Sequence, residues 1–314
     1  MSNWTLADIP SQAGKRILIT GANSGIGYHA AFTLARKGAH VVMACRDRSK
    51  GEAALARITT EAPGTSTELA IFDLASLASI HDFAERELEQ RRPLHVVINN
   101  AGVMAPPQRL QTADGFELQF GTNVLGHFAL TGLLFPALQQ AAAESSEPPR
   151  VITIASIAHK RGRLNFDDLQ YTQNYSPMKT YQQSKLANLM LALEMDRRLR
   201  AAGSPILSIA AHPGVANTNL FQTGERSAIE NAARKALGHL IGAFLNSGQE
   251  GALPTLYAAT ASAAEGGSYY GPQRLQEMCG EYPGPAKLAP QALDTAAAAR
   301  LWTICERLTG TSFL

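Results

Sequence analysis

The stretch "RILITGANSGIGYHAA", residues 16–31, decides the fold. It begins with a short apolar, β-rich run, passes through Gly21, Gly25 and Gly27, and continues in a helical pattern. Glycines between a strand and a helix allow a tight turn and a close approach of the backbone to a pyrophosphate, and the helix N-terminus attracts the anion. A glycine turn in such a connection can be only a turn, but the strand before it and the helix after it favour a nucleotide site.

The same alternation of β-rich and helical runs continues outward from this stretch. Further strands are predicted over 40–44, 68–72, 94–99, 150–156 and 206–211, and helices over 25–37, 49–61, 76–90, 116–142 and 180–199. Continuous apolar strands are typical of a parallel sheet that helices cover on both faces. We therefore predict an α/β fold, a doubly wound parallel sheet in three α/β/α layers, as a single domain over residues 1–314.

Composition excludes several classes of protein. The 314 residues are 45% hydrophobic and 17% charged, with a net charge of +2 and no basic run interleaved with aromatics, so no nucleic-acid surface is expected. Cys45, Cys279 and Cys305 are odd in number and far apart, which argues against a disulfide framework and a zinc site. No signal-peptide pattern or eighteen-residue apolar run is present, so we expect a cytoplasmic protein without a transmembrane segment.

The end of the second strand, "HVVMACRDRSK" at 40–50, concerns the choice of nucleotide. A site for NAD usually presents an acidic residue here, whereas an arginine accommodates the 2′-phosphate of NADP. Cys45 occupies the acidic position and Arg46 follows it, so NADP is favoured over NAD. Because the acidic residue Asp47 is adjacent, NAD stays a possible cofactor. Arg46 could also be a solvated charge in a loop, without a role in binding the cofactor.

Polar residues follow three other strands. Asp73 and Leu74 follow the third strand and Asn99 through Gly102 the fourth, at the strand ends where ligands bind in open α/β sheets, although such residues also form turns. Asn123 lies in a helical pattern where asparagine costs helix propensity. Ser156 ends the fifth strand, where a helix cap is the alternative role.

Tyr181 and Lys185 lie four residues apart in "TYQQSKLANLM", residues 180–190. On a helix they share one face, about 6 Å apart along the axis. The pattern is common in structural helices. The chemical interpretation is that the cation favours the phenolate and brings the tyrosine pKa down from about 10 toward neutral pH.

These motifs, in this order, resemble the short-chain dehydrogenase/reductase family over residues 14 to 215. "ACRDRSKGEAA", "YQQSKLAN" and "GGSYYGP" are similar to the retinol dehydrogenase and protochlorophyllide reductase-like branch. The resemblance implies a Rossmann fold in which Tyr181 is the proton donor or acceptor and Lys185 lowers its pKa and holds the nicotinamide ribose. It also implies that Ser156 donates a hydrogen bond to the substrate oxygen and that Asn123 holds a relay water.

The resemblance also implies the cofactor contacts. It places Gly21, Asn23, Ser24, Gly25, Ile26 and Gly27 around the phosphates, Arg46 at the 2′-phosphate, Asp73 and Leu74 at the adenine, and Asn100, Ala101 and Gly102 along the ribose and diphosphate. It places Pro213, Gly214, Val215 and Thr218 at the nicotinamide carboxamide and the phosphates. Many NADP-dependent relatives carry a basic residue where this chain has Ser24. Arg46 would therefore carry most of the preference for NADP.

In this fold the segment over 215–250 would cover the substrate as a small helical lid. Its part from 225 to 248 has Leu237, Leu240, Ile241 and Phe244 at helical spacing. A core-facing helix, an apolar lid over a lipophilic substrate and attachment to a membrane surface all fit this pattern. Met104, Ile157 and His159 are candidates for the pocket wall, and His159 is interpreted as a loop residue rather than a second acid.

We therefore expect an NADP(H)-dependent oxidoreductase that interconverts a carbonyl and an alcohol on a lipophilic small molecule. A non-catalytic NADP-binding sensor or partner-binding protein is one alternative, but the chain keeps all four residues of the catalytic set. A light-dependent reductase of a tetrapyrrole double bond is another, which a dark assay with NADPH would separate. Several retinol dehydrogenases begin with an apolar anchor that this chain lacks, so retinoid specificity does not follow. The physiological substrate, the direction, and a homodimer or homotetramer stay open.

Overall fold

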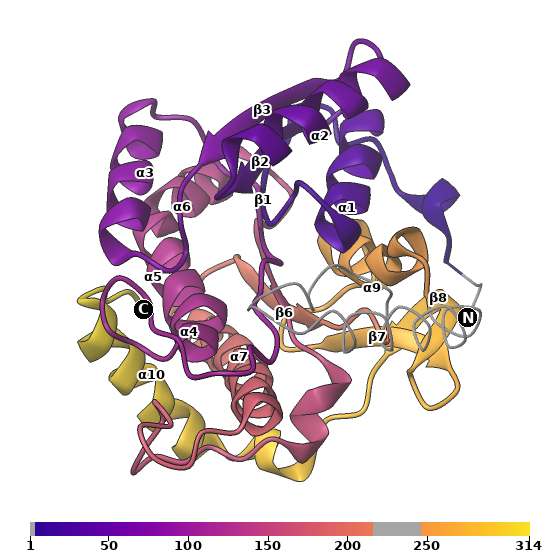
Figure 1. Ribbon diagram of the computed structural model, residues 1–314. Helices are drawn as coiled ribbons and strands as arrows, with labels where there is room; N and C mark the ends of the chain where they lie inside the picture. The colour runs from indigo at the N-terminus through magenta and orange to yellow at the C-terminus, as the bar shows by residue number, and fades with distance from the viewer. Residues whose placement is uncertain (1–3, 216–245) are drawn as a thin grey trace, which may run out of the picture.

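A computed structural model describes residues 4–215 and 246–314, which form one eight-stranded sheet (Figure 1). The strand order is β3-β2-β1-β4-β5-β6-β7-β8, and only β7 and β8 pair in antiparallel fashion. The strands are β1 (Arg16–Thr20), β2 (His40–Cys45), β3 (Ser66–Ile71), β4 (Val96–Asn99), β5 (Arg150–Ile154), β6 (Leu207–Ala211), β7 (Tyr269–Arg274) and β8 (Cys279–Pro285). The predicted doubly wound sheet is confirmed.

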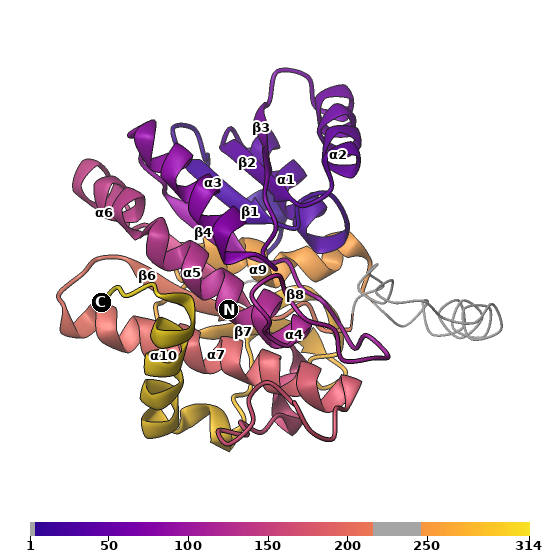
Figure 2. The ribbon, with the colours of Figure 1, turned by 60° about the vertical axis from the view of Figure 1, so that its left-hand side comes forward.

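Helices cover the sheet on both faces. The α-helices are α1 (Gly25–Arg36), α2 (Arg48–Glu61), α3 (Leu77–Glu89), α4 (Leu118–Phe120), α5 (Gly126–Leu133), α6 (Phe135–Glu144), α7 (Pro177–Ala201), α9 (Gly248–Thr260) and α10 (Thr295–Thr309). Shorter helices are η1 (Leu6–Asp8), η2 (Gly121–Leu125), η3 (Ile157–Arg161) and η5 (Pro290–Leu293). One face carries α1, α2 and α9, and the other carries α3, α5, α6, α7 and α10 (Figure 2).

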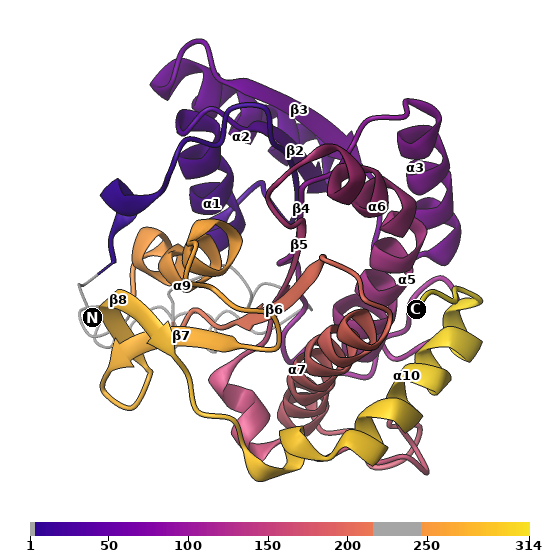
Figure 3. The same ribbon diagram turned by 180° about the vertical axis from the view of Figure 1, so that it is seen from behind.

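The strands are apolar throughout because each supplies side chains to two cores. Leu18 of β1 packs in the core beneath α3, α5 and α7, whereas Ile17 and Ile19 pack in the core beneath α1 and α9. All three are fully buried, and burying such a side chain contributes about 1.5 to 3 kcal/mol. Figure 3 shows α10 alongside α7, where Trp302 lies 4.9 Å, ring to ring, from Phe128 of α5.

The order of the strands creates a crevice. The chain runs outward from β1 through β2 to β3 and then returns to the opposite side of β1 with β4. The loops after β1 and β4 therefore leave in opposite directions, which opens a space at the carboxyl ends of these strands. This is the edge of the sheet at which the sequence places its polar and glycine-rich loops.

The structure departs from the predicted elements in the helix over 116–142 and in the C-terminal part, where α9, α10 and the β7–β8 hairpin were not predicted. The predicted helix over 116–142 is broken into α4, the π-helical turn η2, α5 and α6. The β7–β8 hairpin was not predicted, because its strands "YYGPQR" and "CGEYPGP" contain prolines and glycines that disfavour sheet.

Thr218 and the predicted lid helix with Leu237, Leu240, Ile241 and Phe244 lie outside the described residues. The organisation as one domain over 1–314 with a covering segment over 215–250 thus stays a prediction. Among the described residues, no helix is both long and apolar enough to cross a bilayer.

Candidate active site

One cleft of about 760 Å³ runs along the carboxyl ends of the parallel strands. Its volume is in the range of small-molecule and cofactor sites. The predicted site residues that line it are Gly21, Asn23, Ser24, Gly25, Ile26, Gly27, Arg46, Asp73, Leu74, Asn100, Ala101, Gly102, Ser156, Tyr181, Lys185, Pro213, Gly214 and Val215. Asn123 lies buried behind the wall, and Thr218 lies outside the described residues. The fold thus gathers these residues, whose roles stay predictions.

The turn between β1 and α1 depends on its glycines. Gly21 and Gly25 have φ angles of +67° and +53°, in the left-handed region that favours glycine. A Cβ atom on Gly27 would overlap the carbonyl oxygen of Gly21 and lie 2.5 Å from Asn100 Nδ2. The backbone therefore lies open to the cleft at the N-terminus of α1, where an anionic group is favoured.

Arg46 lies at the end of the cleft formed by β2. Its side chain is 69% exposed, and its guanidinium lies 3.8 Å from the carboxylate of Asp73. The neighbouring Asp47 caps α2, because its side chain accepts a hydrogen bond of 3.0 Å from Lys50 N. Asp47, which kept NAD open in the sequence, therefore caps α2, and the exposed guanidinium of Arg46 belongs to a residue that lines the cleft.

Tyr181 and Lys185 lie one turn apart on α7 and are both buried. Burial raises the pKa of Tyr181 to about 12, and a hydrogen bond with the Ser156 side chain acts in the opposite direction. Burial lowers the pKa of Lys185 to about 8. Lys185 Nζ donates a 2.8 Å hydrogen bond to Ile154 O and lies 5.9 Å from the centre of the Tyr181 ring.

The expected lowering of the Tyr181 pKa by Lys185 is therefore wrong for this structure. Burial of the phenol sets the direction of the shift, because Tyr181 is only 6% exposed, and the hydrogen bond with Ser156 opposes it only in part. The phenol is protonated at neutral pH, as a proton donor must be. Ser156 accepts a 3.2 Å hydrogen bond from Ala158 N, so its hydroxyl proton remains available for donation.

Asn123 occupies the π-helical turn η2 between α4 and α5. Its Oδ1 accepts a 2.8 Å hydrogen bond from Val103 N, and its Nδ2 donates to Val103 O at 3.0 Å and to Ser184 Oγ at 3.1 Å. Turns of this type are frequent at functional sites. The side chain fixes the loop after β4 against α7, and its role as a water ligand stays a prediction.

A buried network that the sequence did not reveal supports the same loop. The Thr20 hydroxyl accepts 2.9 Å hydrogen bonds from Asn100 N and Ala101 N and lies 2.9 Å from His127 Nε2. His127 Nδ1 lies 3.1 Å from Asn123 O. Burial lowers the pKa of His127 to about 4, so the ring is neutral, with Nδ1 as donor and Nε2 as acceptor. In the sequence, the one feature that could have indicated this network is a histidine within the apolar run "VLGHFAL", residues 124–130.

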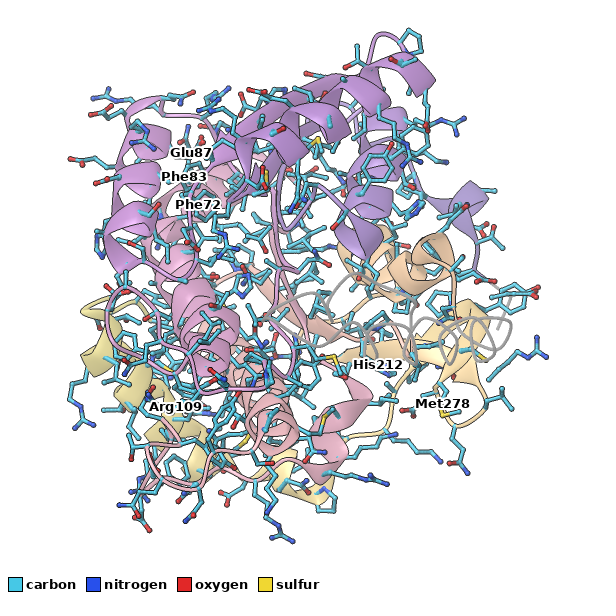
Figure 4. All side chains as sticks on the ribbon, in the orientation of Figure 1. Phe72, Phe83, Glu87, Arg109, His212 and Met278 are labelled. Carbon is cyan, nitrogen blue, oxygen red and sulfur yellow. The ribbon has the colours of Figure 1, made fainter. Side chains whose placement is uncertain are left out.

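Three methionine side chains line part of the cleft. Met104 follows β4, Met178 begins α7 and Met278 lies on the β7–β8 hairpin, as Figure 4 shows for Met278. Ile157 also lines the cleft, as expected for it and for Met104. His159 instead is fully buried, with its Nδ1 atom 2.7 Å from the backbone oxygen of the serine at position 156. The wall offers adaptable apolar contacts.

Nothing in the described part of the chain groups three potential metal ligands, and its three cysteines are free thiols.

The chain is similar to known proteins over nearly its whole length. The short chain dehydrogenase family model matches residues 15–228. Human retinol dehydrogenase 13 is 39% identical over 310 residues, which cover 96% of this chain and 87% of that protein. Mouse polyprenol dehydrogenase is 39% identical over 304 residues, which cover 96% and 86%. A crystal structure of an uncharacterized protein from Mycobacterium paratuberculosis is 41% identical, with a TM-score of 0.79 and complete coverage of both chains.

Solved structures that share the fold contain NADP or NADH. Together with the glycine turn, the strand order and the arrangement of Ser156, Tyr181 and Lys185, these similarities establish the family. The chain belongs to the short-chain dehydrogenase/reductase family, in its retinol dehydrogenase-like branch, and is an oxidoreductase for carbonyl and alcohol groups of small molecules with a nicotinamide cofactor.

Proposed function

We propose that the protein is an NADP(H)-dependent oxidoreductase that interconverts a carbonyl and an alcohol on a lipophilic small molecule, with Tyr181 as the acid and base. The observation that carries the proposal is that a proton donor and two cationic side chains line the same cleft. The buried phenol of Tyr181 and the buried ammonium of Lys185 both lie on α7, and the phenol has a hydrogen bond with Ser156 in the loop after β5. The exposed guanidinium of Arg46 follows β2 in the same cleft.

Three side chains would act on the reacting oxygen. The nicotinamide, when bound, supplies or accepts the hydride. In reduction Tyr181 gives its phenolic proton to the carbonyl oxygen, and in oxidation the phenolate takes the proton from the alcohol. Ser156 donates its hydroxyl proton to the same oxygen and stabilises the negative charge that develops there. Lys185 stabilises the phenolate left after proton transfer.

The hydrogen-bond donors that line the cleft suit the phosphate and ribose groups of NADP. The turn with Gly21, Gly25 and Gly27 would hold the phosphates. A side chain at Gly27 would collide with the backbone of Gly21, and its absence leaves the backbone of the turn accessible from the cleft. Arg46 would bind the 2′-phosphate of NADP, and Lys185 would donate to the nicotinamide ribose. Asp73 and Leu74 would lie at the adenine, and Asn100 through Gly102 along the ribose and diphosphate. Residues 213–215 and Thr218 would lie at the nicotinamide carboxamide and the phosphates.

The preference for a lipophilic substrate rests on the cleft wall and on the relatives. Met104, Met178 and Met278 line the cleft from three separate elements, and methionine adapts its shape to apolar ligands. The relatives are named for retinol and polyprenol, which are alcohols with long hydrocarbon chains. A cytoplasmic location and a single-domain chain belong to the same proposal.

A panel of alcohols and carbonyl compounds of increasing chain length tests the proposal. Turnover is followed in the dark by the absorbance of the reduced nicotinamide, with NADPH and NADH compared at equal concentration. We expect turnover with NADPH that improves with the apolar length of the substrate and is lost in Tyr181→Phe. Tight NADPH binding without turnover of any compound would favour a sensor instead.

A further inference from the structure

The turn of the β7–β8 hairpin has an unusual backbone. Leu275, Gln276 and Glu277 have φ angles of +48°, +54° and +69°, and none of them is glycine. Left-handed backbone costs energy in such residues and persists only where surrounding contacts hold it, often beside ligands. Gln276 and Met278 of this turn line the cleft. The contacts that hold the turn therefore also hold part of the cleft wall.

Glu277 provides those contacts from a buried position. Its side chain is only 9% exposed, and its Oε2 atom lies 2.7 Å from Lys160 Nζ. Its Oε1 atom accepts a 2.8 Å hydrogen bond from Lys287 N. A carboxylate buried in this way is stabilised by its partners, and the loss of one partner leaves an uncompensated charge.

The partners of Glu277 belong to loops that form other parts of the cleft. Lys160 lies in η3, whose N-cap residue is Ser156. On the other side, Val215 N donates a 2.7 Å hydrogen bond to Met278 O, and Gly214 has no room for a Cβ atom against the same oxygen. The hairpin turn is thus joined to the serine loop after β5 and to the loop after β6.

His212 adds a third contact to the same carboxylate. It is fully buried, and its Nδ1 accepts a 3.1 Å hydrogen bond from Gly214 N, so Nε2 carries the proton. Nε2 has no hydrogen-bond partner among the described residues and lies 3.7 Å from Glu277 Oε2. Burial lowers the pKa of His212 to about 3, so the ring is neutral. The Nε2–H group therefore faces the carboxylate of Glu277. The distance is too long for a hydrogen bond, but the electrostatic attraction between the N–H dipole and the carboxylate remains.

We propose that Glu277 is a positioning residue that fixes Gln276 and Met278 against the serine loop and thereby sets which substrates fit the cleft. The inference rests on the proposed function, because it assigns the hairpin turn to the substrate side of the same site. Misplacing a wall by about 1 Å can reduce catalysis by a factor of up to about one hundred. The effect falls mainly on substrate selection, since the side-chain partners of Glu277 are Lys160, Lys287 N and His212. The turn reaches Gly214 and Val215, which are assigned to the nicotinamide, only through the backbone oxygen of Met278.

The kinetic test compares Glu277→Gln and Glu277→Ala with Glu281→Gln. Glu281 lies in the same hairpin but is exposed, with only a 4.0 Å contact to Arg274, so it is a matched control. We expect the substrate KM to rise about tenfold in Glu277→Gln and further in Glu277→Ala, with the preference for long over short substrates reduced in both. The KM for NADPH should rise clearly less than the substrate KM, because the turn reaches the loop after β6 only through the backbone oxygen of Met278. The control should behave as wild type.

Lys160→Met should reproduce the effect of Glu277→Gln, and the double variant should be no worse than either single variant, because the two side chains act as one pair. An unchanged substrate KM and unchanged selectivity in Glu277→Ala would overturn the inference. Equal losses of substrate and NADPH affinity would overturn it too, since they would indicate a general loss of structure.

Hydrogen exchange tests the same inference without any substrate. In Glu277→Ala we expect faster exchange in two separate segments, 156–161 and 275–287, while β1 through β5 exchange as in wild type. Faster exchange confined to 275–287 would show that Glu277 does not hold the serine loop, and the inference would be wrong. If wild type turned over no compound, the proposed function would fail while the exchange result still decided whether Glu277 joins the two loops.

Discussion

Replacing Arg46 by alanine is expected to weaken NADPH binding roughly tenfold to thirtyfold and NADH binding by less than about twofold. A guanidinium can meet a 2′-phosphate with two parallel charge-assisted hydrogen bonds, whereas NADH offers a neutral hydroxyl at that position. The expected difference therefore concerns the ratio of the two affinities.

The magnitude follows from the exposure of the side chain. Hydrogen bonds to charged groups contribute about 1.5 to 3 kcal/mol, and we take the lower half, about 1.5 to 2 kcal/mol, because Arg46 is 69% exposed. Each 1.4 kcal/mol corresponds to about a factor of ten in affinity. Asp73, 3.8 Å from the guanidinium, keeps its charge in the variant and repels the phosphate, which favours the upper end of the range.

The assay is a fluorescence titration of wild type, Arg46→Ala and Arg46→Lys with NADPH and NADH at low and high salt. Arg46→Lys keeps the charge but loses the planar fork, so its affinity for NADPH should lie between the other two. Salt should weaken NADPH binding in wild type more than in Arg46→Ala, because an exposed ion pair is screened. Equal losses for both cofactors in Arg46→Ala, or a wild type that prefers NADH, would refute the reasoning.

Three further predictions concern the inner part of the cleft. Tyr181→Phe should lower kcat by several orders of magnitude with nearly unchanged NADPH affinity, since only the transferable proton is removed; single-turnover rates and a binding titration check this. Gly27→Ala should lower NADPH affinity and the melting temperature together, because its methyl group would meet Gly21 O and Asn100 Nδ2 and overpacking costs about 1 to 3 kcal/mol. Burial lowers the pKa of His127 to about 4 in the folded protein, whereas a histidine in the unfolded chain has a pKa of about 6.5. Below about pH 6.5 the unfolded chain therefore binds more protons at this residue than the folded protein does. The free energy of unfolding should fall by up to about 2 kcal/mol through His127 as the pH is lowered from 7 to 5. Urea unfolding at both pH values should show a smaller difference in His127→Gln, and an equal difference would contradict the buried neutral ring.

The sequence predicts the strands whose side chains are apolar on both faces, because burial on both sides leaves a continuous pattern. Arg16–Thr20 and Leu207–Ala211 are examples in which the predicted and observed strands agree within one residue. The β7–β8 hairpin has no such pattern. Its strands form because β6 offers an open edge to Tyr269 and Tyr270, and this is a tertiary cause that local propensity does not contain.

The position of the candidate site was predictable, but its supporting contacts were not. Glycine spacing and the four-residue interval from Tyr181 to Lys185 are local features of the sequence. The pairing of Glu277 with Lys160 joins residues 117 positions apart, and Thr20 meets His127 across 107 positions. The pKa of Tyr181 was predicted in the wrong direction for the same reason, because the extent of burial is a property of the folded chain.

The outer edge of β8 has a consequence for how copies of this chain can assemble. Pro283 and Pro285 lie in this last strand of the sheet, and Pro272 lies in its neighbour β7. Proline has no backbone N–H group, so an edge that contains it offers few donors to an incoming strand. The hairpin also covers the edge of β7 that would otherwise be free. Continuation of the sheet from one molecule into another through the outer edge of β8 is therefore disfavoured.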